Sequence, residues 1–133
     1  MANAYVSSEI VAQLPAKVGL LAEVAAAVRD SGVNVKAISA YEREGVGKFL
    51  LVTSDDAKAR EALRAMGAET REKQVLIVQM PDEPGSLTEA AGRIAAAGIN
   101  IEYVFGSAAQ EATGPETMLV FGTSDDEAAA KLF

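Results

Sequence analysis

The sequence contains one pattern twice, as Gly19-Leu-Leu-Ala-Glu23 with Gly32-Val-Asn-Val35 and as Gly85-Ser-Leu-Thr-Glu89 with Gly98-Ile-Asn-Ile101. The second occurrence follows the first at a constant offset of 66 residues. The match extends toward the N-terminus, where Gln13-Leu-Pro15 corresponds to Gln79-Met-Pro81 at the same offset. Chance similarity between two alanine-rich helices would leave the flanking residues unmatched, so the pattern predicts an internal duplication.

The duplication also extends toward the C-terminal end of each copy. Thr53-Ser-Asp-Asp56 returns as Thr123-Ser-Asp-Asp126, at an offset of 70 residues. Because the offset grows from 66 to 70, the second copy carries four additional residues, which lie between Tyr103 and Met118. We expect one repeat in residues 1–73 and the other in residues 74–133.

Each copy begins with an apolar run that ends at proline, Glu9–Leu14 and Val75–Met80, which is typical of a strand. Apolar residues then recur at positions i, i+3, i+4 and i+7, and this spacing predicts a helix with one buried face. The predicted buried residues are Leu21, Val24, Ala25 and Val28 in the first copy and Leu87, Ala90, Ala91 and Ile94 in the second. Gly32 and Gly98 follow these helices, where a left-handed C-terminal residue is favoured.

Two strands and a second helix follow in each copy. The predicted strands are Val33–Tyr41, Lys48–Thr53, Ile99–Phe105 and Thr117–Thr123. A turn at Glu44–Gly47 connects the first pair, and a longer loop around Gly114-Pro115 connects the second. Ser54 and Asp55 then cap a helix that ends at Gly67, and the equivalent Ser-Asp pair opens the last helix of the second copy.

The order strand, helix, strand, strand, helix, strand predicts an α+β fold with two ferredoxin-like βαββαβ repeats. Each repeat would be an antiparallel sheet with both helices on one face. The second copy stops at Phe133, so we expect it to lack its last strand, and Met1–Ser8, a partner chain or nothing would cover the open edge. Residues 70–79 include no Gly, Pro, Asn or Asp, which predicts one extended segment passing from the first sheet into the second.

The composition excludes several classes of function. The chain has no cysteine and no histidine, which removes disulfides, thiolate sites and the commonest catalytic base. A net charge of −7 disfavours nucleic acids and anionic membrane surfaces. No apolar run approaches the roughly 20 residues of a membrane helix, and residues 1–8 do not resemble a secretion signal. We therefore expect a cytoplasmic protein without a cofactor, and only a magnesium ion between carboxylates stays open as a metal site.

The connection between the first strand and the first helix offers a binding site in each copy. Pro15–Leu21 and Pro81–Leu87 each place a glycine at the start of a helix, where free backbone amides suit a carboxylate. Asn34 and Asn100 are a second candidate feature, because each follows a helix-ending glycine. The alternative is purely structural: Pro84 begins the helix, and Gly85 makes the turn.

Asp82-Glu-Pro-Gly85-Ser-Leu87, with Ile94 and Gly98-Ile-Asn-Ile101, resembles the ACT domain, a small-molecule-sensing module of amino-acid metabolism. The first copy resembles a second, more divergent ACT domain, so the resemblance covers nearly the whole chain. It implies a ferredoxin-like fold, pairing of domains through their second strands, and an amino acid bound at the junction between domains. The ligand-binding residues that it implies are Asp82, Glu83, Gly85, Ser86, Leu87, Asn34, Asn100, Gly19 and Leu20.

The two copies differ at the implied site. Asp82 or Glu83 would accept the ammonium group of the ligand, whereas the first copy has Ala16 and Val18 where the second has Asp82 and Pro84. We therefore expect two non-equivalent sites, with the second loop the better occupied and Asn34 reaching it from the other repeat. A floor formed by Leu87, Ile99 or Val104 would select the side chain.

The favoured interpretation is an allosteric, amino-acid-sensing regulatory protein, a homodimer that acts on a separate metabolic enzyme. The alternative is an assembly module that binds no ligand and serves as a subunit of an enzyme complex of amino-acid metabolism. An enzyme is disfavoured because no nucleophile lies beside a base, and Asp55-Asp56 and Asp125-Asp126 are at predicted helix caps. RNA binding is disfavoured because Phe49 and Phe121 lie in apolar runs.

Overall fold

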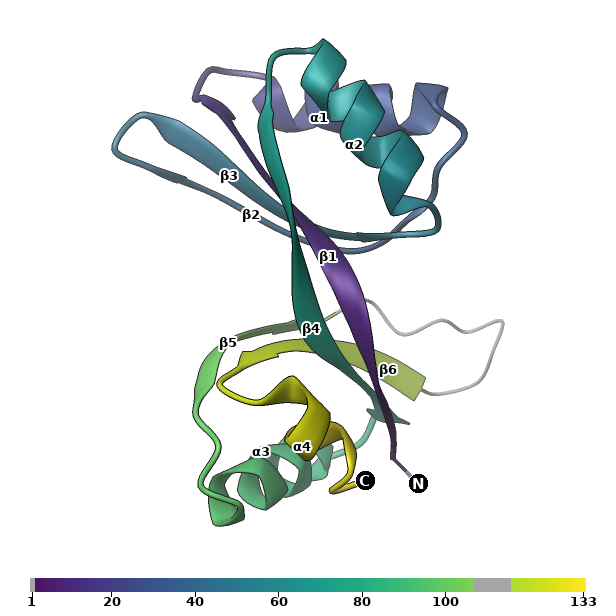
Figure 1. The fold of residues 1–133 in the computed structure, drawn as a ribbon, viewed down its shortest axis with the longest axis vertical. Coiled ribbons are helices and arrows are strands. Elements are labelled where there is room, and N and C mark those ends of the chain that lie inside the picture. Colours follow the sequence, from purple (N-terminus) through teal and green to yellow (C-terminus); the bar gives the residue numbers. More distant parts are fainter. Residues whose placement is uncertain (1, 107–115) are drawn as a thin grey trace. The chain divides into compact units, whose positions relative to one another are not determined.

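The computed structural model describes residues 2–106 and 116–133 of the chain (Figure 1). In order, the elements are β1 (Asn3–Pro15), α1 (Leu20–Asp30), β2 (Val35–Arg43), β3 (Val46–Thr53), α2 (Asp56–Ala65), β4 (Glu69–Pro81), α3 (Ser86–Ala96), β5 (Ile101–Gly106), β6 (Glu116–Thr123) and α4 (Asp126–Ala130). The described strands form one six-stranded sheet in the order β2-β3-β1-β4-β6-β5, so the prediction of a separate sheet for each repeat is wrong. The predicted α+β class with antiparallel strand pairs is confirmed, while the loop expected around Gly114-Pro115 lies outside the described residues.

The chain divides into two compact units. The first unit is Ser8–Lys73, and the second unit is Gln74–Phe133 together with Met1–Ser7. The boundaries between the units fall inside β1 and β4, so each of these strands contributes residues to both units. The N-terminal residues thus group with the second unit, although they precede the first in the sequence.

Strand β4 is the extended segment predicted from the absence of turn residues. It runs without interruption over 13 residues, Glu69–Pro81. Four consecutive residues, Val75–Val78, are each at most 1% exposed. Burial of both faces of a strand explains why this run is continuously apolar instead of alternating.

The first unit packs α1 and α2 against one face of its strands (Figure 1). Strand β1 pairs antiparallel with β3, so that Ile10 lies opposite Leu51 and Ala12 lies opposite Phe49. These four side chains are buried and belong to one core with residues of both helices. The helices contribute Leu20, Val24, Val28, Ala59 and Leu63 to this core.

The second unit repeats this register. Strand β4 pairs antiparallel with β6, so that Leu76 lies opposite Phe121 and Val78 lies opposite Leu119. These residues follow the corresponding residues of the first unit at the two offsets of the sequence match, 66 and 70. The same strand pairing therefore accompanies the same sequence pattern.

The first strand of the chain lies at the position where we expected an open edge. β1 is next to β4 in the sheet, and Ala2 and Ala4 pack against the core of the second unit. Of the three alternatives for this edge, the N-terminal segment of the same chain is the one observed. In the described residues no strand follows α4.

The predicted buried faces of α1 and α3 are partly wrong. Leu21 and Leu87 are each 53% exposed, whereas Leu20, Val24 and Val28 are buried in α1. The reason is a tertiary contact, because Leu20 occupies the space that Gly47 leaves empty. A Cβ atom added at Gly47 would lie 2.7 Å from Leu20 Cδ2. In α3 the buried residues are Ala90 and Ile94.

The repeated Thr-Ser-Asp-Asp and Gly-x-Asn motifs contact each other in both units. Ser54 Oγ accepts a hydrogen bond from the backbone N–H of Asn34 at 2.9 Å, and the carbonyl of Asn34 accepts from the N–H of Ser54. Ser124 and Asn100 form the same pair of bonds. These bonds involve only the backbone of the asparagines. They account for the repeated serine in the motif, but the asparagine side-chain amides take no part in them.

At one pair of facing residues, the two units place the larger side chain on opposite strands. In the second unit Tyr103 lies opposite Gly122, and a Cβ atom at Gly122 would lie 2.2 Å from the tyrosine ring. In the first unit the corresponding pair is Ala37 opposite Val52, and both residues are buried. A large and a small residue have exchanged strands, which keeps the total volume of the pair similar.

We predict that Gly122→Val destabilises the protein by about 1–3 kcal/mol, because the new side chain overlaps the Tyr103 ring. The double variant Tyr103→Ala with Gly122→Val recreates the pair of the first unit and should recover part of that loss. Urea unfolding of both single variants and the double variant measures the coupling. Strictly additive free energies would contradict this account.

We also predict that Ser54→Ala lowers the free energy of unfolding by about 0.5–1.5 kcal/mol, because it removes the hydroxyl that accepts from Asn34. Asn34→Ala keeps both backbone bonds and should change stability by less than about 0.5 kcal/mol. Chemical denaturation of the two variants makes the comparison. An equal loss in Asn34→Ala would show that the amide side chain supports the fold.

Candidate functional site

The four helices begin in two different ways. Asp55 and Asp125 cap α2 and α4, and each side chain accepts a hydrogen bond from a first-turn N–H. Gly19 and Gly85 precede α1 and α3, with φ of 84° and 91°, and neither helix has a side-chain cap. Backbone donors at an uncapped helix start are free to bind an external acceptor, especially an anion.

The start of α1 is held against the β2–β3 hairpin. The N–H of Ala16 donates to the carbonyl of Gly45 at 2.9 Å. The N–H of Leu20 donates to Lys17, and that of Glu23 donates to Gly19. Within the described residues, the amides of residues 21 and 22 have no hydrogen-bond acceptor. Two donors therefore point out of the first turn.

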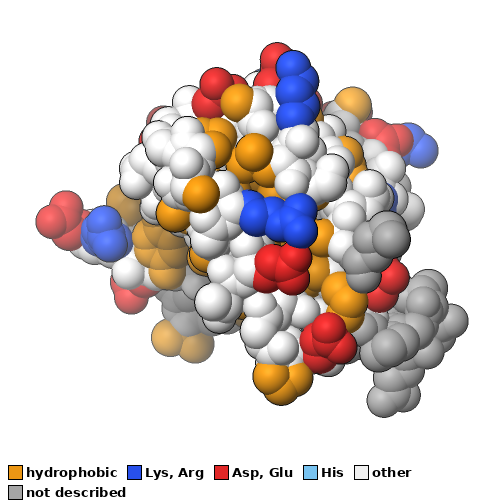
Figure 2. Space-filling view, turned by 90° about the horizontal axis from the view of Figure 1, so that it is seen from below, with side chains coloured by type: hydrophobic (Ala, Val, Ile, Leu, Met, Phe, Trp, Pro, Cys, Tyr) orange, Lys and Arg blue, Asp and Glu red, His pale blue; other side chains and the backbone are white. Residues whose placement is uncertain are grey.

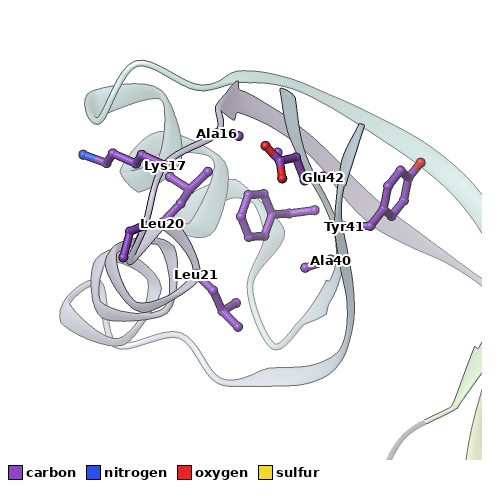
Figure 3. Close-up of a pocket in the computed structure, with 10 residues that line it drawn as sticks. Ala16, Lys17, Leu20, Leu21, Ala40, Tyr41 and Glu42 are labelled. Atoms are coloured by element: carbon purple, nitrogen blue, oxygen red, sulfur yellow. The ribbon is translucent and has the colours of Figure 1, made fainter. Parts of the chain in front are cut away.

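A pocket of about 520 Å³ lies beside this helix start (Figure 3). One wall comes from the β1–α1 connection and the first turn of α1, and the other comes from β2 and β3. The lining residues are Ala16, Lys17, Val18, Leu20, Leu21, Ala40, Tyr41, Glu42, Gly47 and Phe49. Most of this lining is apolar, and its volume is within the range of small-molecule sites.

The charged residues of the pocket differ in their surroundings. The Lys17 ammonium forms an ion pair with Glu23 at 2.9 Å and points away from the pocket (Figure 3). Glu42 forms no ion pair or hydrogen bond with the described part of the chain. Of the two charged residues that line the pocket, the one without an ionic partner is therefore the acid on the β2 side.

Apolar side chains continue from the pocket onto the surface around it. Val18 is 102% exposed and Leu21 is 53% exposed. The Tyr41 side chain points away from the pocket (Figure 3), and its ring centre lies 5.8 Å from the Arg43 guanidinium. Exposed apolar groups in contact with a pocket favour a ligand or partner that covers them.

The corresponding connection in the second unit is less apolar. A pocket of about 370 Å³ includes Glu83 and Ser86, together with Arg93. Arg93 is already engaged, with Glu89 at 2.8 Å and with the carbonyl of Leu132 at 2.9 Å. Of the predicted ligand residues, Asp82, Gly85 and Leu87 are exposed but are not in the lining of this pocket.

Asn34 and Asn100 are separated from the helix starts of their own units. Each follows the helix whose other end carries Gly19 or Gly85, and an 11-residue helix spans about 16 Å. Asn34 lies in a different hollow, of about 400 Å³, with Arg29 and Gly32. Within one unit the structure therefore does not bring the asparagines and the helix-start glycines together.

Sequence reasoning missed the strand side of the first pocket. Ala40, Tyr41 and Glu42 come from the end of β2, and Phe49 comes from β3. The predicted strand ends at Tyr41 and the predicted turn is Glu44–Gly47, but the observed turn is only Glu44-Gly45, with positive φ at both residues, and β2 continues to Arg43. Recognising this two-residue turn would have placed Glu42 on the strand.

The two units differ in charge. The first unit has ten acidic and ten basic residues, whereas the second has nine acidic and two basic residues. Hydrophobic side chains reach the surface at several separate places between the charged ones on the face shown in Figure 2. Among the described residues, no group of His, Cys, Asp or Glu has the arrangement of a metal site, and no helix is long and apolar enough to cross a membrane.

Structural comparison finds similar folds in solved proteins. A protein of Bacteroides thetaiotaomicron has a TM-score of 0.84 and 25% identity, over 98% of this chain and 88% of that chain. The regulatory subunit of aspartate kinase from Thermus thermophilus has a TM-score of 0.67 and 18% identity, over 96% and 94%. That of Thermus flavus has a TM-score of 0.62 and 18% identity, over 98% and 93%. At 18% identity, the likeness establishes the fold alone.

Sequence comparison gives a narrower result. No curated protein matches the chain. The family model of the ACT domain matches residues 74–133, the part of the chain that includes β5, β6, α3 and α4. The predicted resemblance is confirmed for this part. Residues 74–133 therefore contain an ACT domain.

Proposed function

We propose that the chain is a regulatory protein of two ACT-type units that binds a free amino acid and has no catalytic role of its own. The observation that carries the proposal is the uncapped start of α1, with two free amides beside an apolar pocket. The common strand register at offsets of 66 and 70 residues supports a second ACT-type unit in residues 8–73.

An amino acid matches the chemistry of an uncapped helix start. Its carboxylate would accept hydrogen bonds from the first-turn amides and gain from the helix dipole. Each bond to a charged group contributes about 1.5–3 kcal/mol, so two or three bonds are compatible with micromolar binding after the cost of immobilisation. Acidic residues near both starts, Glu42 in one unit and Asp82 and Glu83 in the other, suit the ammonium group.

Asn34 and Asn100 keep a proposed role in binding. Both are exposed, and their φ is not positive, so the backbone does not require asparagine at either position. Because they lie at the far ends of α1 and α3, any contact with a ligand at Gly19 or Gly85 would come from another ACT unit. This arrangement is the one that the family resemblance implies.

The target of regulation would be a separate protein. Regulatory subunits of aspartate kinase share the fold, and by analogy of fold we propose that a metabolic enzyme on another chain receives the signal. We also propose a homodimer. Both proposals rest on the fold and are independent of which amino acid binds.

An assembly module is the second candidate. Strands β2 and β5 are the outermost strands of the sheet order, and their Ile38 and Val104 are 39% and 43% exposed. Outermost strands with exposed apolar side chains favour association with another chain. In this alternative the chain would bind a partner and no small molecule.

A thermal-shift screen separates the two candidates. We expect at least one amino acid to raise Tm, because a ligand that binds only the native state stabilises it by about 2.7 kcal/mol at a concentration 100 times its Kd. Isothermal titration calorimetry then confirms saturable binding. A Tm that responds to protein concentration and to none of the amino acids would favour the assembly module.

Proline substitutions identify the helix start that binds the ligand. Ala22→Pro removes one free amide from α1, and Thr88→Pro removes the equivalent amide from α3, at positions in a first turn that tolerates proline. The variant at the occupied start should lose affinity by about tenfold or more. Ala57→Pro, in the first turn of the aspartate-capped helix α2, is the control and should bind normally. Normal binding by both test variants would exclude the helix starts.

A further inference from the structure

We propose that the pocket beside α1 selects amino acids with a bulky apolar side chain, of leucine to phenylalanine size, and that Glu42 holds their ammonium group. The proposal rests on the proposed function, since it names the ligand class of that site. It places the selective site in the first unit, whereas sequence reasoning favoured the second.

The shape and lining of the pocket favour a bulky apolar group. Leu20 fills the space above Gly47, and the Phe49 ring and the Ala40 methyl group complete the lining on the strand side. The volume of about 520 Å³ leaves room for more than a small polar amino acid. Burial of apolar surface of the ligand against these residues would supply affinity that glycine or serine lacks.

The charges on the pocket favour a cationic group on the strand side and an anionic group on the helix side. Lys17 is neutralised by Glu23 at 2.9 Å, which leaves Glu42 as the acid without an ionic partner among the described pocket residues. The opposite wall includes the first turn of α1, in which the amides of residues 21 and 22 have no acceptor among the described residues. A zwitterion can therefore bridge the two walls, with its side chain between them.

The second unit lacks this combination. At the positions of Leu20, Gly47 and Phe49, it has Ser86, Thr117 and Leu119. Asp82 and Glu83 lie just before its uncapped helix, so although they would attract the ammonium group of a ligand they would repel its carboxylate from the positive helix end. The nine acidic and two basic residues of that unit add to the repulsion of an anion.

Calorimetric titration of the full chain with L-leucine, L-phenylalanine, glycine and L-serine tests the selectivity. We expect the two apolar amino acids to bind at least tenfold more tightly than glycine and serine. Ala40→Leu fills the pocket from an exposed strand position and should weaken leucine binding by tenfold or more. Ala57→Leu, on the exposed surface of α2, is the matched control and should bind leucine normally.

The role of Glu42 is tested with 4-methylpentanoate, which is leucine without its amino group. The unmodified protein should bind leucine at least tenfold more tightly than this analogue. Glu42→Gln should bring the two affinities within about threefold of each other, whereas the control Glu61→Gln, on exposed α2, should keep the difference. A difference that persists in Glu42→Gln would overturn the assignment.

The outcomes separate this inference from the proposed function. If a small polar amino acid binds and Ala40→Leu has no effect, the pocket assignment is wrong while amino-acid binding stands. If no amino acid binds, the proposed function itself is wrong. If Ala40→Leu instead abolishes a dimer seen by native mass measurement, and no ligand binds, a second copy of the chain covers the pocket.

Discussion

Both compact units depend on β1 and β4, because each of these 13-residue strands contributes residues to both. Within each unit a central strand has to supply core residues to the helix-covered face, and Ile10 and Leu76 do so at equivalent positions. A break in either strand would remove hydrogen bonds and core contacts from both units. The uninterrupted course of β4, without a turn between residues 69 and 81, is therefore a requirement of the fold.

The described helices differ in how their first turns are capped. Aspartate caps close α2 and α4 locally, and the same motif joins its serine to the backbone of Asn34 or Asn100. Glycine leaves α1 and α3 without a side-chain cap. The capped starts satisfy their first-turn amides within the fold, whereas the uncapped starts leave amides free for the ligand that we propose.

Much of the fold was predictable from the sequence because the duplication shows each element twice. The shared offsets of 66 and 70 residues fixed which strands correspond, and the structure shows the same register in both units. The buried face of α1 was not predictable, because Leu20 and Leu21 fit the helical spacing equally and the contact that Leu20 makes at Gly47 comes from a distant strand. The pocket was missed for a similar reason: its Glu42 wall depends on a hairpin whose strands continue two residues closer to the turn than predicted.

The division of β1 between the units also affects how the chain is made. Residues 3–7 are synthesised before β4, yet they group with the unit to which most of β4 belongs. At about 5–20 residues per second, β4 is complete roughly 3–13 s after β1. During that interval a nascent chain carries an unpaired strand edge in residues 3–7, which is a target for chaperones that recognise such edges.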